Sequence, residues 1–344
     1  MDIKKNTKLI PYEDDDFLWG FKDSNGKIII PAQFDEVGKF KEGLIRVCNE
    51  EGYGYLDKEG GVAIPLKFSY ATEFEKGTAL VEEENLGISY FIDKTGRKIG
   101  KGNYSNILLD FIDDTTVGTL LSGKKILLSR KGLPVSNAYD SIEATDDGEH
   151  WYFEENGIGG IMNSKGEVII YPGKYEFDNP YYSDGMILVT KDDLYGYVNE
   201  EGNLAIPLKY EEAKAFDGGL AIVRFKDKAG IIDTTGSIVG EIKYDEVYSF
   251  QEDLYPVKLN EKWGFINKQG QEVIPLIYDQ VYKFHEGLAG VRKGTKWGFI
   301  DPEGNEVIPF VFDLVWDFKD GKAKVKKDNK EYYVDTIGKM YNYE

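Results

Sequence analysis

The sequence contains few of the residues from which enzymes and disulfide-stabilised proteins are built. Its 344 residues include one cysteine, Cys48, and two histidines, His150 and His285. A single cysteine excludes an internal disulfide framework, and no cluster of ligating residues has the spacing of a metal site. A nucleophile elbow and a phosphate-binding glycine loop are also absent from the sequence. We therefore expect a protein that is not an enzyme and that uses no cofactor and no metal.

Positive charge is also scarce. The chain has 42 Lys and Arg against 61 Asp and Glu, a formal net charge of -19. Binding to a phosphate backbone requires clustered cations, so we expect no nucleic-acid partner. A basic protein partner, a cation or a neutral glycan is compatible with this charge. The alternative is that the acidic residues only keep a large β surface soluble.

Long apolar runs are missing as well. No stretch is long and apolar enough to span a membrane, and the N-terminal MDIKKNTKLI has no apolar run of a secretory signal behind its lysines. We expect a cytoplasmic protein, or a secreted one if a signal has been removed. The oligomeric state stays open, because the edges of a long β-array invite pairing.

One fixed period organises the residues that are abundant, among them 39 glycines and 24 tyrosines. The segment KWGFINKQG (262–270) returns 34 residues later as KWGFIDPEG (296–304). Ten glycines recur at spacings of 34 or 36 residues, and the third residue before each is Asp, Asn or Ser. They are Gly26, Gly60, Gly96, Gly132, Gly166, Gly202, Gly236, Gly270, Gly304 and Gly338. Such a period indicates tandem repeats.

Each repeat reads as short strands and tight turns. The D-x-x-G unit predicts a type I turn followed by a G1 bulge, which closes a hairpin. A calcium loop is the rival interpretation of DSNGK (23–27), but the rest of the EF-hand ligand spacing is absent. The turn is followed by a run such as EVIP (272–275), whose proline must end a strand or lie on an edge. A link such as YDQVYKF (278–284) and a strand such as GLAGV (287–291) complete a three-stranded meander.

These residues resemble the WG-repeat family, with its W-G-F-I-D/N-x-x-G core and V-I-P-x-x-Y-D tail. The match is close in the repeats that start at Trp19, Tyr53, Tyr195, Trp263 and Trp297, and weak between Ser89 and Gly159. The resemblance implies an all-β repeat protein, commonly bacterial, with no general catalytic activity and no site residues to transfer. Because the first position of the W-G pair varies, we interpret the pair as packing, with the glycine admitting a neighbouring ring or backbone.

We expect an all-β fold: an open, twisted, solenoid-like array of about nine three-stranded repeats plus a terminal hairpin. A closed ring resembling a β-propeller is the alternative. A polar leader (1–16) precedes a single array (17–344), whose middle (98–175) departs furthest from the repeat pattern. The leader and the tail YNYE (341–344) are expected to cover the ends.

One variable position inside the repeat is the candidate binding site. It holds Gly38, Thr72, Lys214, Tyr248, Tyr282 and Trp316. Stacked repeats would align the last three as a row of rings, which we call the aromatic row. Three acidic residues, Glu246, Asp317 and Asp320, stand beside it in the sequence and would receive a basic partner. The alternative is that the rings pack into the core between repeats.

Three functions follow from this pattern. The first is an acidic interaction scaffold whose protein partner is basic or extended. The second is a glycan-binding or cell-wall-binding array that uses the aromatic row. The third is a carboxylate glycoside hydrolase, which is the weakest because no pair among the 61 acidic residues stands out.

Overall fold

The computed structural model of the chain describes residues 9–145, 147–177, 180 and 182–342. These residues form thirty-eight β-strands and one 3-10 turn, η1 (Glu84–Leu86). No helix in this part of the chain has the length and apolar character needed to cross a membrane. Contacts divide the chain into two compact units, Met1–Lys174 and Tyr175–Glu344. Residues 1–8 of the expected leader and the last two residues of the tail lie outside the described residues.

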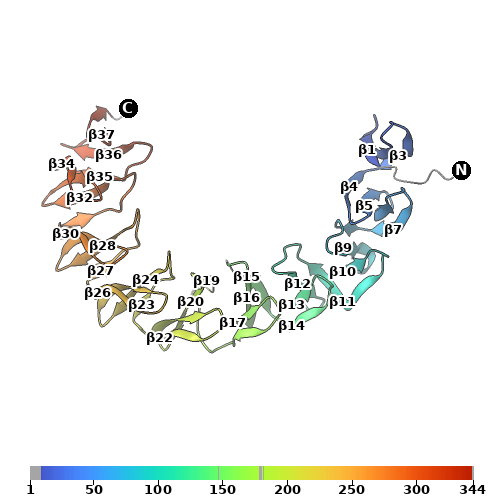
Figure 1. Ribbon diagram of the computed structural model, residues 1–344, viewed down its shortest axis with the longest axis horizontal. Coiled ribbons are helices and arrows are strands. Elements are labelled where there is room, and N and C mark those ends of the chain that lie inside the picture. The colour runs from blue at the N-terminus through green and yellow to red at the C-terminus, as the bar shows by residue number, and fades with distance from the viewer. Residues whose placement is uncertain (1–8, 146, 178–179, 181, 343–344) are drawn as a thin grey trace. The chain divides into compact units, whose positions relative to one another are not determined.

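The first unit contains eighteen strands, and successive sheets follow the chain order (Figure 1). They are β1 (Ile10–Glu13), β2 (Trp19–Lys22), β3 (Ile28–Phe34), β4 (Glu36–Lys41), β5 (Leu44–Asn49), β6 (Gly52–Asp57), β7 (Val62–Phe68), β8 (Tyr70–Ala71), β9 (Thr78–Glu83), β10 (Ile88–Asp93), β11 (Lys98–Ile107), β12 (Thr115–Leu120), β13 (Lys125–Ser129), β14 (Pro134–Tyr139), β15 (Ser141–Ala144), β16 (His150–Glu155), β17 (Ile158–Asn163) and β18 (Val168–Ile170).

The second unit contains the remaining twenty strands, arranged as five four-stranded sheets. They are β19 (Tyr182–Ser183), β20 (Met186–Lys191), β21 (Leu194–Asn199), β22 (Leu204–Tyr210), β23 (Glu212–Ala213), β24 (Leu220–Phe225), β25 (Lys228–Asp233), β26 (Ile238–Tyr244), β27 (Glu246–Val247), β28 (Leu254–Leu259), β29 (Lys262–Asn267), β30 (Glu272–Tyr278), β31 (Gln280–Val281), β32 (Ala289–Lys293), β33 (Lys296–Ile300), β34 (Glu306–Phe312), β35 (Leu314–Val315), β36 (Lys322–Lys327), β37 (Lys330–Asp335) and β38 (Met340–Asn342).

The tandem array predicted from the sequence is confirmed. One repeat comprises β27, β28, β29 and β30, which pair antiparallel in that order. The last three are the strands of the predicted meander, and the link adds a two-residue strand at one edge. The sheets are separate structures in chain order, and none formed by the described residues closes into a barrel. Within each unit the fold is therefore a tandem array of small antiparallel meanders.

The turns have the predicted geometry. In the turn after β29, the amide of Gly270 donates to the Asn267 carbonyl at 2.9 Å, and the Asn267 side-chain oxygen accepts from Gln269 N at 3.0 Å and Gln271 N at 2.9 Å. All ten periodic glycines have φ between 66° and 85°. Glycine adopts this region without the steric cost that a Cβ brings, which explains why the residue recurs there.

The glycine of the W-G pair admits the backbone of the neighbouring fourth strand. A Cβ built on Gly264 would lie 2.4 Å from the Ile274 carbonyl oxygen, and one on Gly298 would lie 2.7 Å from that of Ile308. Gly20, Gly54 and Gly196 meet the equivalent carbonyl oxygen at 2.6–2.8 Å. The predicted close approach is thus confirmed. The fourth strand carries the proline and lies at the edge of the sheet. Proline has no backbone N–H, and an edge strand tolerates this because one of its sides has no neighbouring strand to bond.

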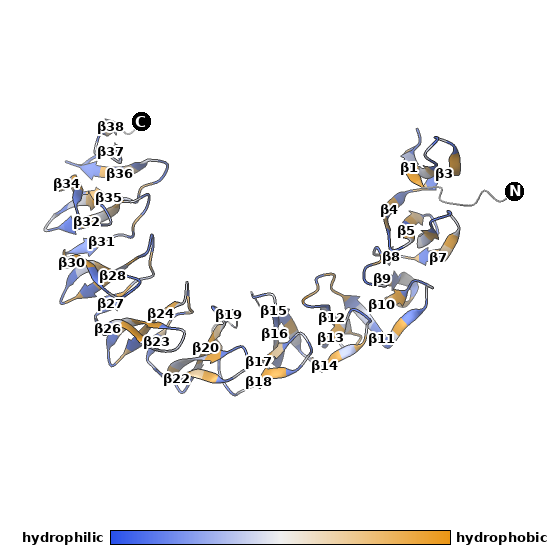
Figure 2. Ribbon diagram, viewed as in Figure 1, coloured by the Kyte–Doolittle hydropathy of each residue, from blue (hydrophilic) through white to orange (hydrophobic). Residues whose placement is uncertain are grey.

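The cores lie between successive repeats. Phe265 and Ile274 of one repeat are buried with Phe284 and Val291 of the next. The rings of Phe265 and Phe284 meet edge-on with centroids 5.0 Å apart, a favourable aromatic geometry. Figure 2 shows orange apolar stretches beside blue polar stretches along the ribbon. Each repeat therefore contributes one side of two cores and is stabilised mainly by its neighbours.

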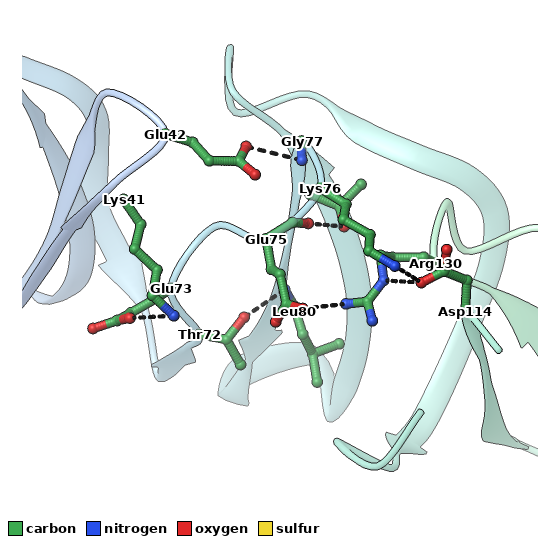
Figure 3. Close-up of polar contacts among 11 residues, drawn as sticks. Lys41, Glu42, Thr72, Glu73, Glu75, Lys76, Gly77, Leu80, Asp114 and Arg130 are labelled. Atoms are coloured by element: carbon green, nitrogen blue, oxygen red, sulfur yellow. Dashed lines mark hydrogen bonds and ion pairs between the residues drawn. The ribbon is translucent and has the colours of Figure 1, made fainter. Parts of the chain in front are cut away.

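Polar contacts between turns join neighbouring repeats outside these cores. Lys76 and Gly77 form a turn with φ of 50° and 84°, the type I′ geometry preferred in two-residue hairpins. The Gly77 amide donates to the Glu42 carboxylate of the preceding repeat at 2.9 Å, as Figure 3 shows. The same contact joins Asp184 to Gly219, Glu252 to Gly287 and Glu286 to Gly321. We call these contacts the turn ladder.

Candidate functional site

The aromatic row occupies one structural position in three consecutive repeats. Tyr248, Tyr282 and Trp316 follow the short first strand of their sheets. Each donates its backbone N–H to a carbonyl oxygen of the second strand, at 3.0, 2.8 and 3.0 Å. The alignment that the sequence suggested therefore corresponds to real equivalence in three dimensions.

Two of these rings are packed on one side and open to solvent on the other. Tyr248 lies on Trp263 with centroids 5.0 Å apart, and Tyr282 stacks on Trp297 at 4.7 Å with an interplanar angle of 20°. Both tryptophans are buried, whereas Tyr248 is 48% exposed and Tyr282 is 36% exposed. Tyr248 and Tyr282 thus each cover a buried tryptophan of the W-G pair with one ring face and expose the other face to solvent.

The third ring has a different partner. Trp316 is 40% exposed, and the W-G position of its repeat holds Glu331 in place of an aromatic residue. The Lys324 ammonium takes the place of that ring, 5.1 Å from the Trp316 centroid, and it pairs with Glu331 at 2.9 Å. A cation above an indole is an attractive arrangement, and it covers part of the ring face.

Glu246 is the acidic candidate that lies directly beside the row. Its carboxylate accepts from the Tyr248 hydroxyl at 2.7 Å and from Lys258 Nζ at 2.8 Å. The Lys258 bond is the main reason that the pKa of Glu246 lies below its usual value. The same carboxylate raises the pKa of the Tyr248 hydroxyl. Glu246 is therefore an ionised residue that already has two partners.

The other two acidic candidates, Asp317 and Asp320, have different partners. Asp317 faces His285 of the preceding repeat at 3.6 Å, and its charge adds to the burial that raises the pKa of Tyr282. Asp320 lies in a hairpin turn with φ of 54° and donates its amide to Glu286 at 2.8 Å. Asp317 thus belongs to the surroundings of the row, whereas the described contacts of Asp320 belong to the turn ladder.

Sequence reasoning missed a set of cations next to the row. They are Arg224, Lys258, Arg292 and Lys326, which recur every 34 residues on the second strand of their sheets. Their cross-strand neighbours on the short first strand are Glu212, Glu246, Gln280 and Leu314. The 34-residue recurrence was visible in the sequence. That these cations have acidic neighbours in two repeats and neutral neighbours in the other two can be recognised only when the strand register is known.

Small hollows occur where the W-G aromatic residue is replaced. A cleft of about 420 Å³ borders Ser89, which holds the W-G position of its repeat. A second hollow of about 70 Å³ borders Ala229, the equivalent residue two repeats before Trp297. The row position in these two repeats holds Thr72 and Lys214, so neither repeat has a ring pair. The aromatic row is therefore a local specialisation of the array.

No group of three or more His, Cys, Asp or Glu side chains in the described part of the chain is arranged to hold a metal ion. His150 is buried, and its Nδ1 lies 2.7 Å from Asp147. His285 is far along the chain, beside Asp317. The two histidines thus belong to different local networks.

Comparison with known proteins identifies the repeat. The family model described as "WG containing repeat" matches residues 19–52, 53–86, 160–195, 195–228, 230–263, 263–297 and 297–330. No curated protein matches the chain.

Among solved structures, the chain is similar to a eukaryotic initiation factor (10% identity, TM-score 0.37, 99% of this chain and 96% of that one). It is also similar to BamB from Moraxella catarrhalis (12% identity, TM-score 0.26, 100% and 94%). A third similar structure is KlHsv2 with loop 6CD replaced by a Gly-Ser linker (8% identity, TM-score 0.30, 74% and 98%). TM-scores this low do not establish a shared fold.

Proposed function

Because this chain belongs to the WG-containing repeat family, we propose that it is a non-enzymatic binding scaffold whose aromatic row holds a protein partner. The observation that carries the proposal is the row itself. Tyr248, Tyr282 and Trp316 occupy the same position in three consecutive repeats and keep between 36% and 48% of their surface exposed. Tyrosine and tryptophan dominate the energetics of protein interfaces because they offer large, rigid contact areas.

The packing beneath the rings supports the proposal. A ring that rests on a buried tryptophan loses little conformational freedom when a partner covers its other side, which favours binding. The rings of Tyr248 and Tyr282 are held in this way. A row of pre-positioned rings suits an extended segment that runs across several repeats.

A glycan remains the second candidate, because an open ring face also suits a sugar ring. One contact weakens this interpretation at the end of the row. The Lys324 ammonium lies 5.1 Å from the Trp316 centroid and competes for the ring face. We therefore place the protein partner first.

The test compares capture of partners from native lysate by the wild-type chain and by a triple variant, Tyr248→Thr, Tyr282→Thr and Trp316→Thr. Thr72 shows that the fold accommodates threonine at this position. The control places threonine at three exposed apolar residues away from the row, Ile238, Val273 and Ile277. We expect a protein that the wild type and the control retain and the row variant loses, with unchanged circular dichroism. Equal capture by all three proteins contradicts the proposal.

A further inference from the structure

We infer that the end of the aromatic row formed by Tyr282 and Trp316, together with Arg292 and Lys326, binds an acidic peptide segment. This inference rests on the proposed function and names the chemistry of the partner. It runs against the net charge of the chain, which by itself favours a basic partner. The local distribution of charge is the reason for the difference.

Charge is distributed unevenly along the chain. Residues 280–331 contain ten Lys and Arg and nine Asp and Glu, a net charge of +1. The charges of all other residues therefore sum to -20, which together with +1 gives the net charge of -19. Strand β36 alone reads KAKVKK, with Ala323 and Val325 buried and its lysines turned away from the core. Local potential, and not net charge, decides which partner a surface attracts.

Two of the four recurrent cations have carboxylate partners and two do not. Arg224 pairs with Glu212 at 3.3 Å, and Lys258 pairs with Glu246 at 2.8 Å. The corresponding neighbours of Arg292 and Lys326 are Gln280 and Leu314. Neither cation forms an ion pair with any residue that the structure describes. The repeats that carry the last two rings thus contain two cations without an ion-pair partner among the described residues.

Arg292 has a further unsatisfied group. Its Nε is buried and has no acceptor, although a buried donor without a partner is destabilising and uncommon. The nearest strand neighbour on the other side is Trp297, the ring on which Tyr282 stacks. The guanidinium therefore lies beside the ring pair at the boundary with the last repeat.

The acidic residues around this position already have other partners, although, besides the bond from Lys262, the Arg292 charge also helps to lower the pKa of Asp279. Asp279 accepts from Lys262 Nζ and from the Gly294 amide, both at 2.6 Å. Asp313 accepts from Lys296 Nζ at 2.6 Å. Asp317 faces His285. An external carboxylate would therefore bind at the terminal nitrogens of Arg292, because its Nε is buried.

A peptide fits this surface better than an anionic glycan. A guanidinium binds a carboxylate through two parallel hydrogen bonds, and arginine with tyrosine and tryptophan is the composition of a protein-binding hot spot. An aromatic or aliphatic side chain of the same peptide would cover the open face of Tyr282. The Lys324 ammonium above Trp316, which is paired with Glu331, obstructs a stacked sugar.

The test measures fluorescence anisotropy of a labelled nonapeptide made of three Glu-Glu-Phe units, with three Gln-Gln-Phe units as the neutral probe. The decisive variant is Gln280→Glu, which supplies Arg292 with the carboxylate that Glu212 and Glu246 supply in other repeats. Gln269→Glu, in an exposed turn, adds the same charge away from the row. Arg292→Gln removes the cation itself.

We expect the acidic probe to bind and the neutral probe to bind at least about tenfold more weakly, the range typical of a charged hot spot. Gln280→Glu and Arg292→Gln should each weaken the acidic probe by about tenfold, and Gln269→Glu by less than about twofold. Absence of binding, or binding that Gln280→Glu leaves unchanged, overturns the inference. Tighter binding of an oligogalacturonate of similar charge also overturns it, in favour of a glycan.

Failure of this inference can be separated from failure of the proposed function. If both peptides bind equally and the threonine variant of the row binds neither, the row is a binding face that does not select acidic segments. If no peptide binds but the row variant loses a captured protein, the scaffold function stands and its partner has another chemistry. If no peptide binds and the row variant captures the same proteins as the wild type, both proposals are contradicted.

Discussion

Replacing Gly264 by alanine should destabilise the array, because this glycine sets the distance between two strands. The added Cβ would lie 2.4 Å from the Ile274 carbonyl oxygen, whereas ordinary contacts begin at 3.4 Å. The two strands must separate by about 1 Å, and forced expansion of a packed region typically costs about 1–3 kcal/mol. Alanine also restricts the unfolded chain, which offsets about 0.4–1 kcal/mol. We expect a net loss of about 1–2 kcal/mol.

The control is Gly38→Ala, the same chemical change at a glycine without positive φ. Its Cβ first meets a side-chain oxygen of Glu73 at 3.0 Å, a contact that a small shift of this side chain relieves, although the same oxygen accepts from the Lys39 amide at 2.7 Å. We expect a change within about 0.5 kcal/mol. Urea unfolding followed by circular dichroism measures both variants, and hydrogen exchange locates the weakened repeats. If Gly264→Ala is as stable as the wild type, the glycine does not act by admitting the neighbouring backbone.

Three further changes test other parts of the structure. Asn267→Ala removes the acceptor of two turn amides and should lower the free energy of unfolding by about 1 kcal/mol; an unchanged urea midpoint would contradict the turn geometry. Glu286→Ala opens one rung of the turn ladder, so amide exchange at Gly321 should accelerate, and exchange at the wild-type rate would argue against it. Because the Lys258 bond lowers the pKa of Glu246, stability from this pair is present at neutral pH and is lost as pH falls below about 4.5; Glu246→Gln should flatten that acid loss.

Much of the fold could be predicted because local chemistry determines it. The turn around Gly270 needs a side chain that accepts hydrogen bonds and a residue that adopts positive φ. Both residue types can be recognised directly in the sequence. The packing of Gly264 against a neighbouring backbone could be inferred from the same kind of argument. The equivalence of Tyr248, Tyr282 and Trp316 followed from counting along the period.

The candidate site could be predicted only in part, because it depends on neighbours across strands. The rings were proposed to be either core or surface, and stacking on Trp263 and Trp297 makes them partly both. Arg292 lacks the carboxylate neighbour of Arg224 and Lys258 because Gln280 faces it on the adjacent strand. That pairing depends on the register of a two-residue strand, which no periodicity in the sequence revealed.

The most direct test of the binding surface is photo-crosslinking from the row itself. A benzoylphenylalanine at position 282 would lie on the open side of the ring stack, and one at position 238 would replace Ile238, an exposed apolar residue of the same unit. We expect a discrete protein adduct in native lysate from position 282 and none from position 238. The absence of an adduct at 282, or the same adduct at both positions, would contradict the claim that the aromatic row holds a protein partner.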